Sequence, residues 1–236
     1  MESILLASSS ARRREMLARL GVSFTVSSPE VDESLRDDLA PPSRVVALAE
    51  DKVAAAAARL EGPSPRLVLG ADTLVCLPSG DAPSSGGEIV MGKPEGRDEA
   101  RRMIQAIQGR DHLVHTGLAL LDRRSGQLRR SRSDSLVRFA PMSPDEVEAY
   151  LDTGEWEGAA GAYRIQGAAA LHIIRIEGSW SGIVGLPLRE LYVMLGEAGY
   201  RVSGNRRAHS AAGPSRPEPS ASVPEPFGAG SGGEIQ

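Results

Sequence analysis

Short apolar runs alternate with helical stripes of apolar residues along the first part of the chain. The run at 4–7 predicts a buried strand that ends at a serine turn, and the apolar positions between 16 and 20 have the spacing of a helix that follows this turn. A second strand is expected at 24–26. The apolar stripe from Val45 to Leu60 predicts a second helix, with Ser43 as its N-cap.

The middle of the chain predicts a hairpin followed by a helix. Residues 66–77 form an apolar strand interrupted by Gly-Ala-Asp-Thr at 70–73, and a turn-rich stretch at 78–87 leads to a returning strand at 88–91. We expect a hairpin with a long, mobile tip. The next helix turns its apolar residues inward and ends at Gly109.

The following segments complete an α/β pattern. Two strands flank the turn at 122–127. Ser143 to Glu146 is a capping box with proline at the first helical position, which predicts a helix as far as Asp152. A strand at 171–176 and a helix at 187–198 follow. Strands that alternate with helices and hairpins predict the α/β class with a mixed sheet.

Composition separates one domain from a tail. The chain is 41% hydrophobic and 25% charged, which is ordinary for a soluble globular protein. From Ser203 onward, 17 of 34 residues are Pro, Gly or Ser, so too little apolar surface remains to offset the entropy of ordering. We therefore expect one domain at 1–202 and a disordered tail at 203–236.

Charge and cysteine content exclude several classes of protein. With 27 basic and 31 acidic residues, the net charge of -4 gives no reason to expect stable nucleic-acid or membrane binding. Cys76 is the only cysteine, which excludes an internal disulfide and a cysteine-rich metal site. The apolar stretch within Met1–Ala7 is too short for a signal peptide. These features favour a cytoplasmic protein.

The serine turn is the first candidate site. A strand that ends in Ser8-Ser9-Ser10 and leads into a helix directs free backbone N–H groups at whatever lies beyond it, and such a place attracts phosphate. Arg12 and Arg13 in the first turn oppose the helix dipole, which a bound anion would explain. The alternative is a Ser10 cap with two solvated arginines.

Asp72 is the second candidate, because a carboxylate within an apolar strand is costly unless it is paired, hydrogen-bonded or bound to a metal. The neighbouring Gly70 allows either a bulge or a close approach of another backbone segment. The alternative is an aspartate in a turn between two short strands.

Two lysines and an acidic loop complete the candidates. Lys52 flanks the apolar stripe of its helix and could reach a cleft, although snorkelling to water is the alternative. Lys93 lies on a stiff Gly-Lys-Pro loop, where it is either functional or simply exposed. Glu33, next to Asp32, could share a divalent ion with Asp72, or could belong to a solvated acidic loop.

The histidines and the cysteine receive no role. His112 and His115 are three residues apart in a predicted strand, so their side chains point to opposite faces and lack metal-ligand spacing. A Cys76–His dyad is conceivable, but a cysteine in an apolar strand is expected to be buried as a small hydrophobic residue.

Taken in order, these segments resemble the Maf family of nucleotide pyrophosphatases. The blocks that carry the resemblance are Leu6–Arg13 (LASSSARR), Glu30–Glu33 (EVDE), Lys52, Leu69–Thr73 (LGADT), Gly92–Pro94 (GKP), Ala162–Gly167 (AYRIQG) and Val184–Leu188 (VGLPL). The resemblance implies a mixed α/β sheet in two lobes around a cleft, similar to the inosine triphosphate pyrophosphatases, and a homodimer. It also implies hydrolysis of a nucleoside triphosphate to the monophosphate and pyrophosphate, with Mg, Mn or Co as the divalent metal cofactor.

The resemblance also implies roles for individual residues. Asp72 matches the catalytic carboxylate, which acts as general base on the attacking water, and Glu33 matches an acidic position near the metal that Asp72 would also bind. The positions that line the triphosphate are matched by Ser8, Arg13, Lys52 and Lys93.

Three further positions indicate the substrate. Arg12, Thr73 and Gln166 match the branch that resembles dTTP and UTP pyrophosphatases, and the amide of Gln166 can both donate to and accept from the edge of a pyrimidine. Ala11, Ser9 and Arg164 depart from the common pattern. Arg164 could alter the base pocket or add a phosphate contact.

Two other classes of function remain open at this stage, a nucleotide-binding regulator of cell division or septum formation and an inactive structural homologue. The intact Asp72 favours turnover over both. Within the enzyme class, modified or damaged nucleotides are alternative substrates, because a pyrimidine pocket can admit modified bases.

Overall fold

The computed structural model describes residues 3–80 and 87–202. The predicted tail lies outside these residues, and so do residues 81–86 of the predicted hairpin tip. Within the described part, no helix has the length and apolar character needed to cross a membrane.

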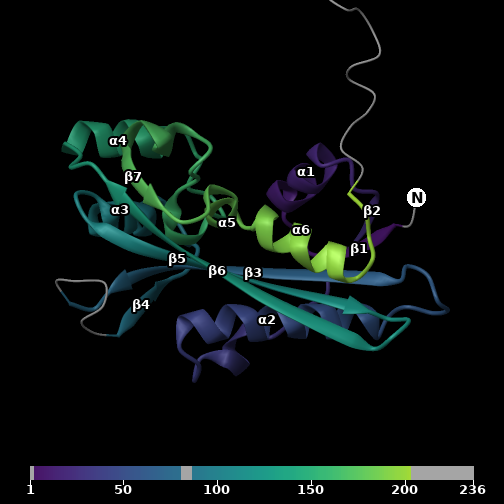
Figure 1. Ribbon diagram of the computed structural model, residues 1–236. Helices are drawn as coiled ribbons and strands as arrows, with labels where there is room; N and C mark the ends of the chain where they lie inside the picture. The colour runs from purple at the N-terminus through teal and green to yellow at the C-terminus, as the bar shows by residue number, and fades with distance from the viewer. Residues whose placement is uncertain (1–2, 81–86, 203–236) are drawn as a thin grey trace, which may run out of the picture. The chain divides into compact units, whose positions relative to one another are not determined.

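The strands of the described chain join in one seven-stranded sheet, drawn in Figure 1. They are β1 (Ile4–Ala7), β2 (Phe24–Ser27), β3 (Leu67–Pro78), β4 (Glu88–Met91), β5 (Asp111–Asp122), β6 (Gln127–Phe139) and β7 (Ile173–Glu177). Their order is β2-β1-β3-β5-β6-β7, and β4 pairs with β3 outside this path. β1 is parallel to β2 and β3, whereas the other pairs are antiparallel, which confirms the predicted mixed sheet.

The helices cover both faces of this sheet. They are α1 (Ala11–Arg19), α2 (Pro41–Ala57), α3 (Arg97–Ile107), α4 (Pro144–Asp152), α5 (Trp180–Val184) and α6 (Leu188–Glu197), with 3-10 turns η1 (Glu33–Arg36), η2 (Ala160–Ala162) and η3 (Ala168–His172). α2 packs on one face, against β3 and β5, and α5 and α6 lie on the other. In Figure 1, α1 and α6 lie together near β1 and β2, whereas α3 and α4 lie together near β7. These two groups correspond to the two lobes expected of the fold.

Two glycines allow α2 to lie unusually close to the sheet. A Cβ atom at Gly70 of β3 would lie 2.4 Å from the carbonyl oxygen of Ala49, and one at Gly117 of β5 would lie 2.3 Å from that of Val45. Of the two roles considered for Gly70, the structure shows the close backbone approach. The pairing of β3 with β5 runs without a shift through this region. The predicted interruption of the strand at 70–73 is therefore wrong, and so is the alternative that placed Asp72 in a turn.

Other local differences have simple causes. α2 begins at Pro41 rather than after Ser43, because prolines at its first two positions need no N–H partner there. β7 begins two residues later than expected because residues 168–172 form a 3-10 turn. The capping box of α4 is confirmed: Ser143 Oγ accepts from the Glu146 N–H, and the Glu146 carboxylate accepts from the Ser143 N–H.

Candidate active site

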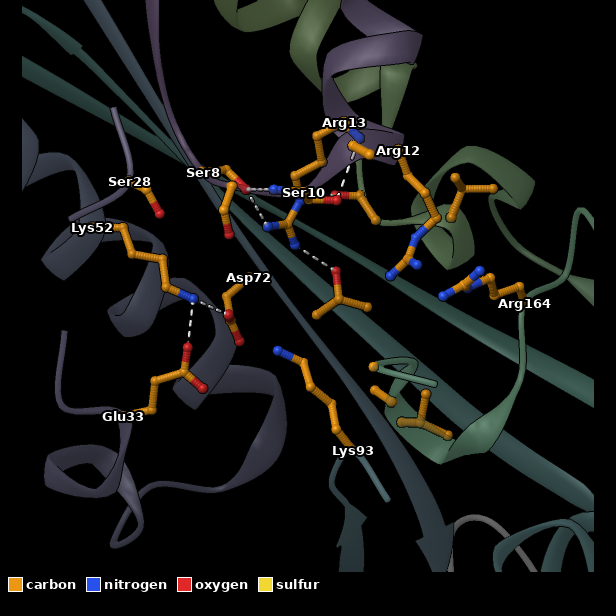
Figure 2. Close-up of a pocket in the computed structure, with 18 of the residues that line it drawn as sticks. Ser8, Ser10, Arg12, Arg13, Ser28, Glu33, Lys52, Asp72, Lys93 and Arg164 are labelled. Atoms are coloured by element: carbon orange, nitrogen blue, oxygen red, sulfur yellow. Dashed lines mark hydrogen bonds and ion pairs between the residues drawn. The ribbon is translucent and has the colours of Figure 1, made fainter. Parts of the chain in front are cut away.

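All nine residues that the sequence assigned to substrate or metal line one cleft, which is shown in Figure 2. They are Ser8, Arg12, Arg13, Glu33, Lys52, Asp72, Thr73, Lys93 and Gln166. The cleft has a volume of about 750 Å³, within the usual range for a small-molecule site. The residues come from the end of β1, the start of α1, η1, α2, β3, the loop after β4 and the segment between η2 and η3. Tertiary folding therefore brings together groups that are far apart in the sequence.

A lysine joins two carboxylates on one side of the cleft. Lys52 Nζ donates to Asp72 Oδ1 at 2.5 Å and to Glu33 Oε1 at 2.8 Å. The side chains of Asp72 and Lys52 are only 8% and 15% exposed, so this pair is largely shielded from water. Lys52 reaches across to β3 because α2 lies so close to Gly70. The alternative that Lys52 snorkels into solvent is therefore wrong.

Glu33 is held as a carboxylate by the positive charges around it. Burial alone would raise its pKa, but the hydrogen bond from Lys52 and the charges of Lys52, Lys93 and Arg44 more than offset this, and the pKa is lowered. The acidic loop is thus connected to the cleft rather than merely solvated.

Arg13 is partly buried and makes three side-chain hydrogen bonds. Its Nε donates to the carbonyl of Gly185 at 2.7 Å, Nη1 donates to Ser8 Oγ at 3.1 Å and Nη2 donates to Thr73 Oγ1 at 3.1 Å. Burial lowers the pKa of this guanidinium, although the charge of Asp72 opposes the change. Ser10 does cap α1, as its hydroxyl accepts from the Arg13 N–H at 3.5 Å, but Arg13 is not solvated.

These bonds reveal a role for Gly185 that sequence reasoning did not assign. Gly185 has a positive φ of 116°, which turns the chain after α5 and presents its carbonyl to Arg13. The VGLPL block thus holds Arg13 in place. The one sequence signal that could have indicated a role for Gly185 was its position in the VGLPL block at 184–188, which is among the motifs of the Maf resemblance.

Arg12 and Arg164 bring like charges to the far side of the cleft. Burial and the nearby charge of Arg164 lower the pKa of Arg12. Arg164 donates from Nη2 to the carbonyl of Glu157 at 2.6 Å, and its buried Nε has no hydrogen-bond partner among the described residues. Figure 2 shows both guanidinium groups and the Lys93 ammonium directed toward the cleft. Such an arrangement favours a multiply charged anion.

Asp72 and Glu33 fit a divalent cation. The second carboxylate oxygen of Asp72, Oδ2, is buried and has no hydrogen-bond partner in the described part of the chain. A buried oxygen without a partner is costly, and hard divalent cations prefer carboxylate oxygens. The pair therefore has the donor chemistry for Mg or Mn.

The two strand histidines do point in opposite directions. His112 Nε2 lies 2.8 Å from the Tyr163 hydroxyl, within an aromatic group that includes Phe139, and burial lowers its pKa to about 4. It is a neutral core residue. His115 instead lies on the α2 side of the sheet beside Cys76 and Glu88. The sequence assigned it no role because these neighbours come from other strands.

A basic cleft at the N-terminus of a helix, with a buried carboxylate beside it, defines an enzyme of the class that hydrolyses phosphate anhydrides. The comparisons with known proteins place the chain more narrowly. The family model described as Maf-like protein matches residues 3–198, and the chain belongs to the Maf family.

Several similar proteins bear the name dTTP/UTP pyrophosphatase. That of Treponema denticola is 42% identical over 205 residues, which cover 86% of this chain and 100% of the relative. Those of Pelotomaculum thermopropionicum and Moorella thermoacetica are also 42% identical, over 202 and 204 residues. Each covers 86% of this chain, and the matches span 100% and 99% of the two relatives.

Proposed function

We propose that this protein hydrolyses dTTP and UTP to the monophosphate and pyrophosphate, as a house-cleaning enzyme of the cytoplasmic nucleotide pool. The names of the similar proteins support the reaction and the substrates. The observation that carries the proposal is Asp72, whose buried Oδ2 has no partner in the described chain, in a cleft lined by four arginine and lysine side chains of the predicted site.

Each residue of the cleft has a separate role in the proposed reaction. The triphosphate lies against the serine turn and Arg13, where backbone N–H groups and a guanidinium meet its oxygens. Lys52 and Lys93 neutralise the oxygens of the β and γ phosphates. Asp72 accepts a proton from water as the water oxygen bonds to the α phosphorus, and the bond from that phosphorus to the bridging oxygen breaks to release pyrophosphate.

Glu33 and Asp72 would hold the divalent cation. When bound, Mg, Mn or Co supplies positive charge next to the phosphate oxygens. Lys52 already contacts both carboxylates, so it keeps the two side chains facing the same space.

Selectivity for pyrimidines rests on the opposite side of the cleft. Gln166 both donates and accepts hydrogen bonds, as recognition of a thymine or uracil edge requires. Thr73 acts indirectly, because its hydroxyl accepts from Arg13 and lies 2.9 Å from that of Thr116. Arg12 and Arg164 add positive charge beside the bound nucleotide.

The proposal is tested by pyrophosphate release from a panel of canonical and modified nucleoside triphosphates with Mg or Mn. Asp72→Asn should lower kcat for dTTP and UTP by at least about 100-fold, because a general base contributes about that much or more. Asp145→Asn, an exposed position at the start of α4, is the matched control and should retain activity. Unchanged turnover in Asp72→Asn would exclude Asp72 as the base.

The regulator of cell division is the competing function, and binding without turnover across the panel would favour it. The buried Asp72 supports turnover instead, because a carboxylate held in a cleft beside a lysine is suited to act as a general base.

We also propose a homodimer, as the family resemblance implies. The edge strand β7 exposes Ile174 and Ile176, and Leu171 just before it is 84% exposed. An apolar edge of this kind is suited to a subunit contact. Light scattering on the purified protein should give twice the mass of the chain, and a monomer at micromolar concentration would refute this part of the proposal.

A further inference from the structure

A thiol, a carboxylate and an imidazole lie close together on the face of the sheet that α2 covers, and each is a type of side chain that can bind a metal ion. They are Cys76 of β3, Glu88 of β4 and His115 of β5, and one ligand atom from each lies within 4.8 Å of the others. The strand register explains the convergence. Cys76 pairs with Val90 on one side and Leu113 on the other. Glu88 and His115 are each two residues from these partners, so their side chains share the face of Cys76.

The histidine is oriented from both ring nitrogens. His115 Nε2 lies 2.8 Å from Glu88 Oε2, and His115 Nδ1 lies 2.7 Å from Asp134 Oδ1 on β6. The side chain of His115 is only 4% exposed, and Cys76 is fully buried. In many metal sites a carboxylate accepts a hydrogen bond from the ring nitrogen of a ligating histidine that does not bind the metal. This bond sets the tautomer and the orientation of the ring.

We propose that Cys76, Glu88 and His115 bind a Zn²⁺ ion, with Asp134 orienting His115 and a water molecule as the fourth ligand. A thiolate, an imidazole and a carboxylate together match the preference of zinc for mixed sulfur, nitrogen and oxygen ligands. Binding displaces the proton of the Cys76 thiol into solvent, and the sulfur then donates its electron pair to the ion.

The surroundings of Cys76 oppose its ionisation in the absence of a cation. Burial and the adjacent Glu88 raise the pKa of the thiol, whereas the nearby charge of Arg44 on α2 lowers it. A bound cation would offset the negative charges of Glu88 and of the Cys76 thiolate.

This site is separate from the carboxylate pair of the active site. Cys76 lies four residues beyond Asp72 on β3, which corresponds to about 13 Å along a strand. The ion would connect β3, β4 and β5, and β4 leads directly to the loop that carries Lys93. We therefore expect zinc to stabilise the fold and to secure this hairpin.

The test is a titration of metal-free, full-length protein with Co²⁺, which replaces zinc and absorbs light. A sulfur-to-cobalt charge-transfer band in the near ultraviolet should appear, saturate at one equivalent and disappear on addition of Zn²⁺. Cys76 is the only cysteine, so the band can arise only there. Cobalt at Asp72 and Glu33 has oxygen ligands and gives no such band. The readout is thus independent of catalysis.

Variants distinguish a built site from a lone thiol. His115→Gln and the more exposed Glu88→Gln should each abolish the band at stoichiometric Co²⁺, and circular dichroism would verify their folds. Asp134→Asn should weaken binding by roughly 10–100-fold, and Asp72→Asn, the control, should leave it unchanged. No band in the wild-type protein, or a band that survives both ligand substitutions, would overturn the proposal.

Thermal unfolding provides a second measurement. Zinc at 100-fold above its Kd should raise Tm by roughly 5–10 °C in the wild-type protein, because it binds only the folded chain. An unchanged Tm at saturating zinc would contradict the expected stabilisation.

Discussion

Replacement of Gly70 by alanine tests how the close packing of α2 controls the active site. The added Cβ atom would lie 2.4 Å from the carbonyl oxygen of Ala49 and 2.8 Å from Val53 Cγ2. The first of these is backbone, so no side-chain rotation can relieve the contact. α2 has to retreat by about 1 Å to restore an ordinary separation of 3.4 Å.

Both stability and catalysis should suffer. Overpacking of this kind costs about 1–3 kcal/mol of unfolding free energy, which leaves a domain of ordinary stability folded at 25 °C. Lys52 moves with α2, so its contact with Asp72 on β3 lengthens. A misplacement of about 1 Å at a reacting centre can lower the rate by about 100-fold.

Urea denaturation and pyrophosphate release measure the two effects on the same preparation. Gly196→Ala on α6 is the matched control, because a Cβ atom there meets nothing within 4 Å. It should retain activity and gain about 0.5–1 kcal/mol of stability. If Gly70→Ala behaves like Gly196→Ala in both assays, then α2 does not set the position of Lys52 as argued.

Three further predictions concern the metal, pH and the tail. Glu33→Gln should raise the Mg or Mn concentration that gives half-maximal activity by at least about 10-fold, because one carboxylate ligand is lost. Asp32→Asn, the control at the neighbouring exposed position, should leave this concentration unchanged. If Glu33→Gln requires no more metal than the wild-type protein, Glu33 is not a metal ligand. Burial lowers the pKa of His112 to about 4, although the charge of Asp111 opposes this. The stabilisation that comes from keeping this imidazole neutral is therefore complete above about pH 6.5. The free energy of unfolding should decrease by about 3 kcal/mol as the pH falls toward 4. Urea denaturation at several pH values should show this loss reduced in His112→Phe but retained in His172→Gln. Deletion of 203–236 should leave kcat unchanged, since the family match ends at residue 198; a large decrease would show that the tail contributes to function.

The sequence was enough to name the residues of the candidate site but not to predict how they contact one another. The cluster of Lys52, Asp72 and Glu33 is an example. The motifs carrying these residues are local and ordered along the chain, so a single sequence was enough to name them. The 2.5 Å separation of Lys52 Nζ from Asp72 Oδ1 depends on the distance between α2 and β3, which two glycines on different strands determine.

The predicted fold was wrong at positions where the residue type is explained by a contact with a segment remote in the sequence. Gly70 and Asp72 suggested a break in a strand, yet β3 is continuous, because the glycine makes room for a helix and the aspartate is paired with a lysine on that helix. Ser43 suggested a helix cap, whereas proline begins α2 without one.

The amino-acid sequence alone was enough to predict the alternation of strands and helices, the capping box of α4, the serine turn before α1 and the residues that line the cleft. These features depend on spacing within a few residues, or on motifs that are legible in order along the chain. Two features became visible only in the folded chain: the carbonyl of Gly185 holds Arg13, and Cys76, Glu88 and His115 share one face of the sheet. Such contacts depend on strand register and helix packing, which join residues remote in the sequence and leave no local pattern.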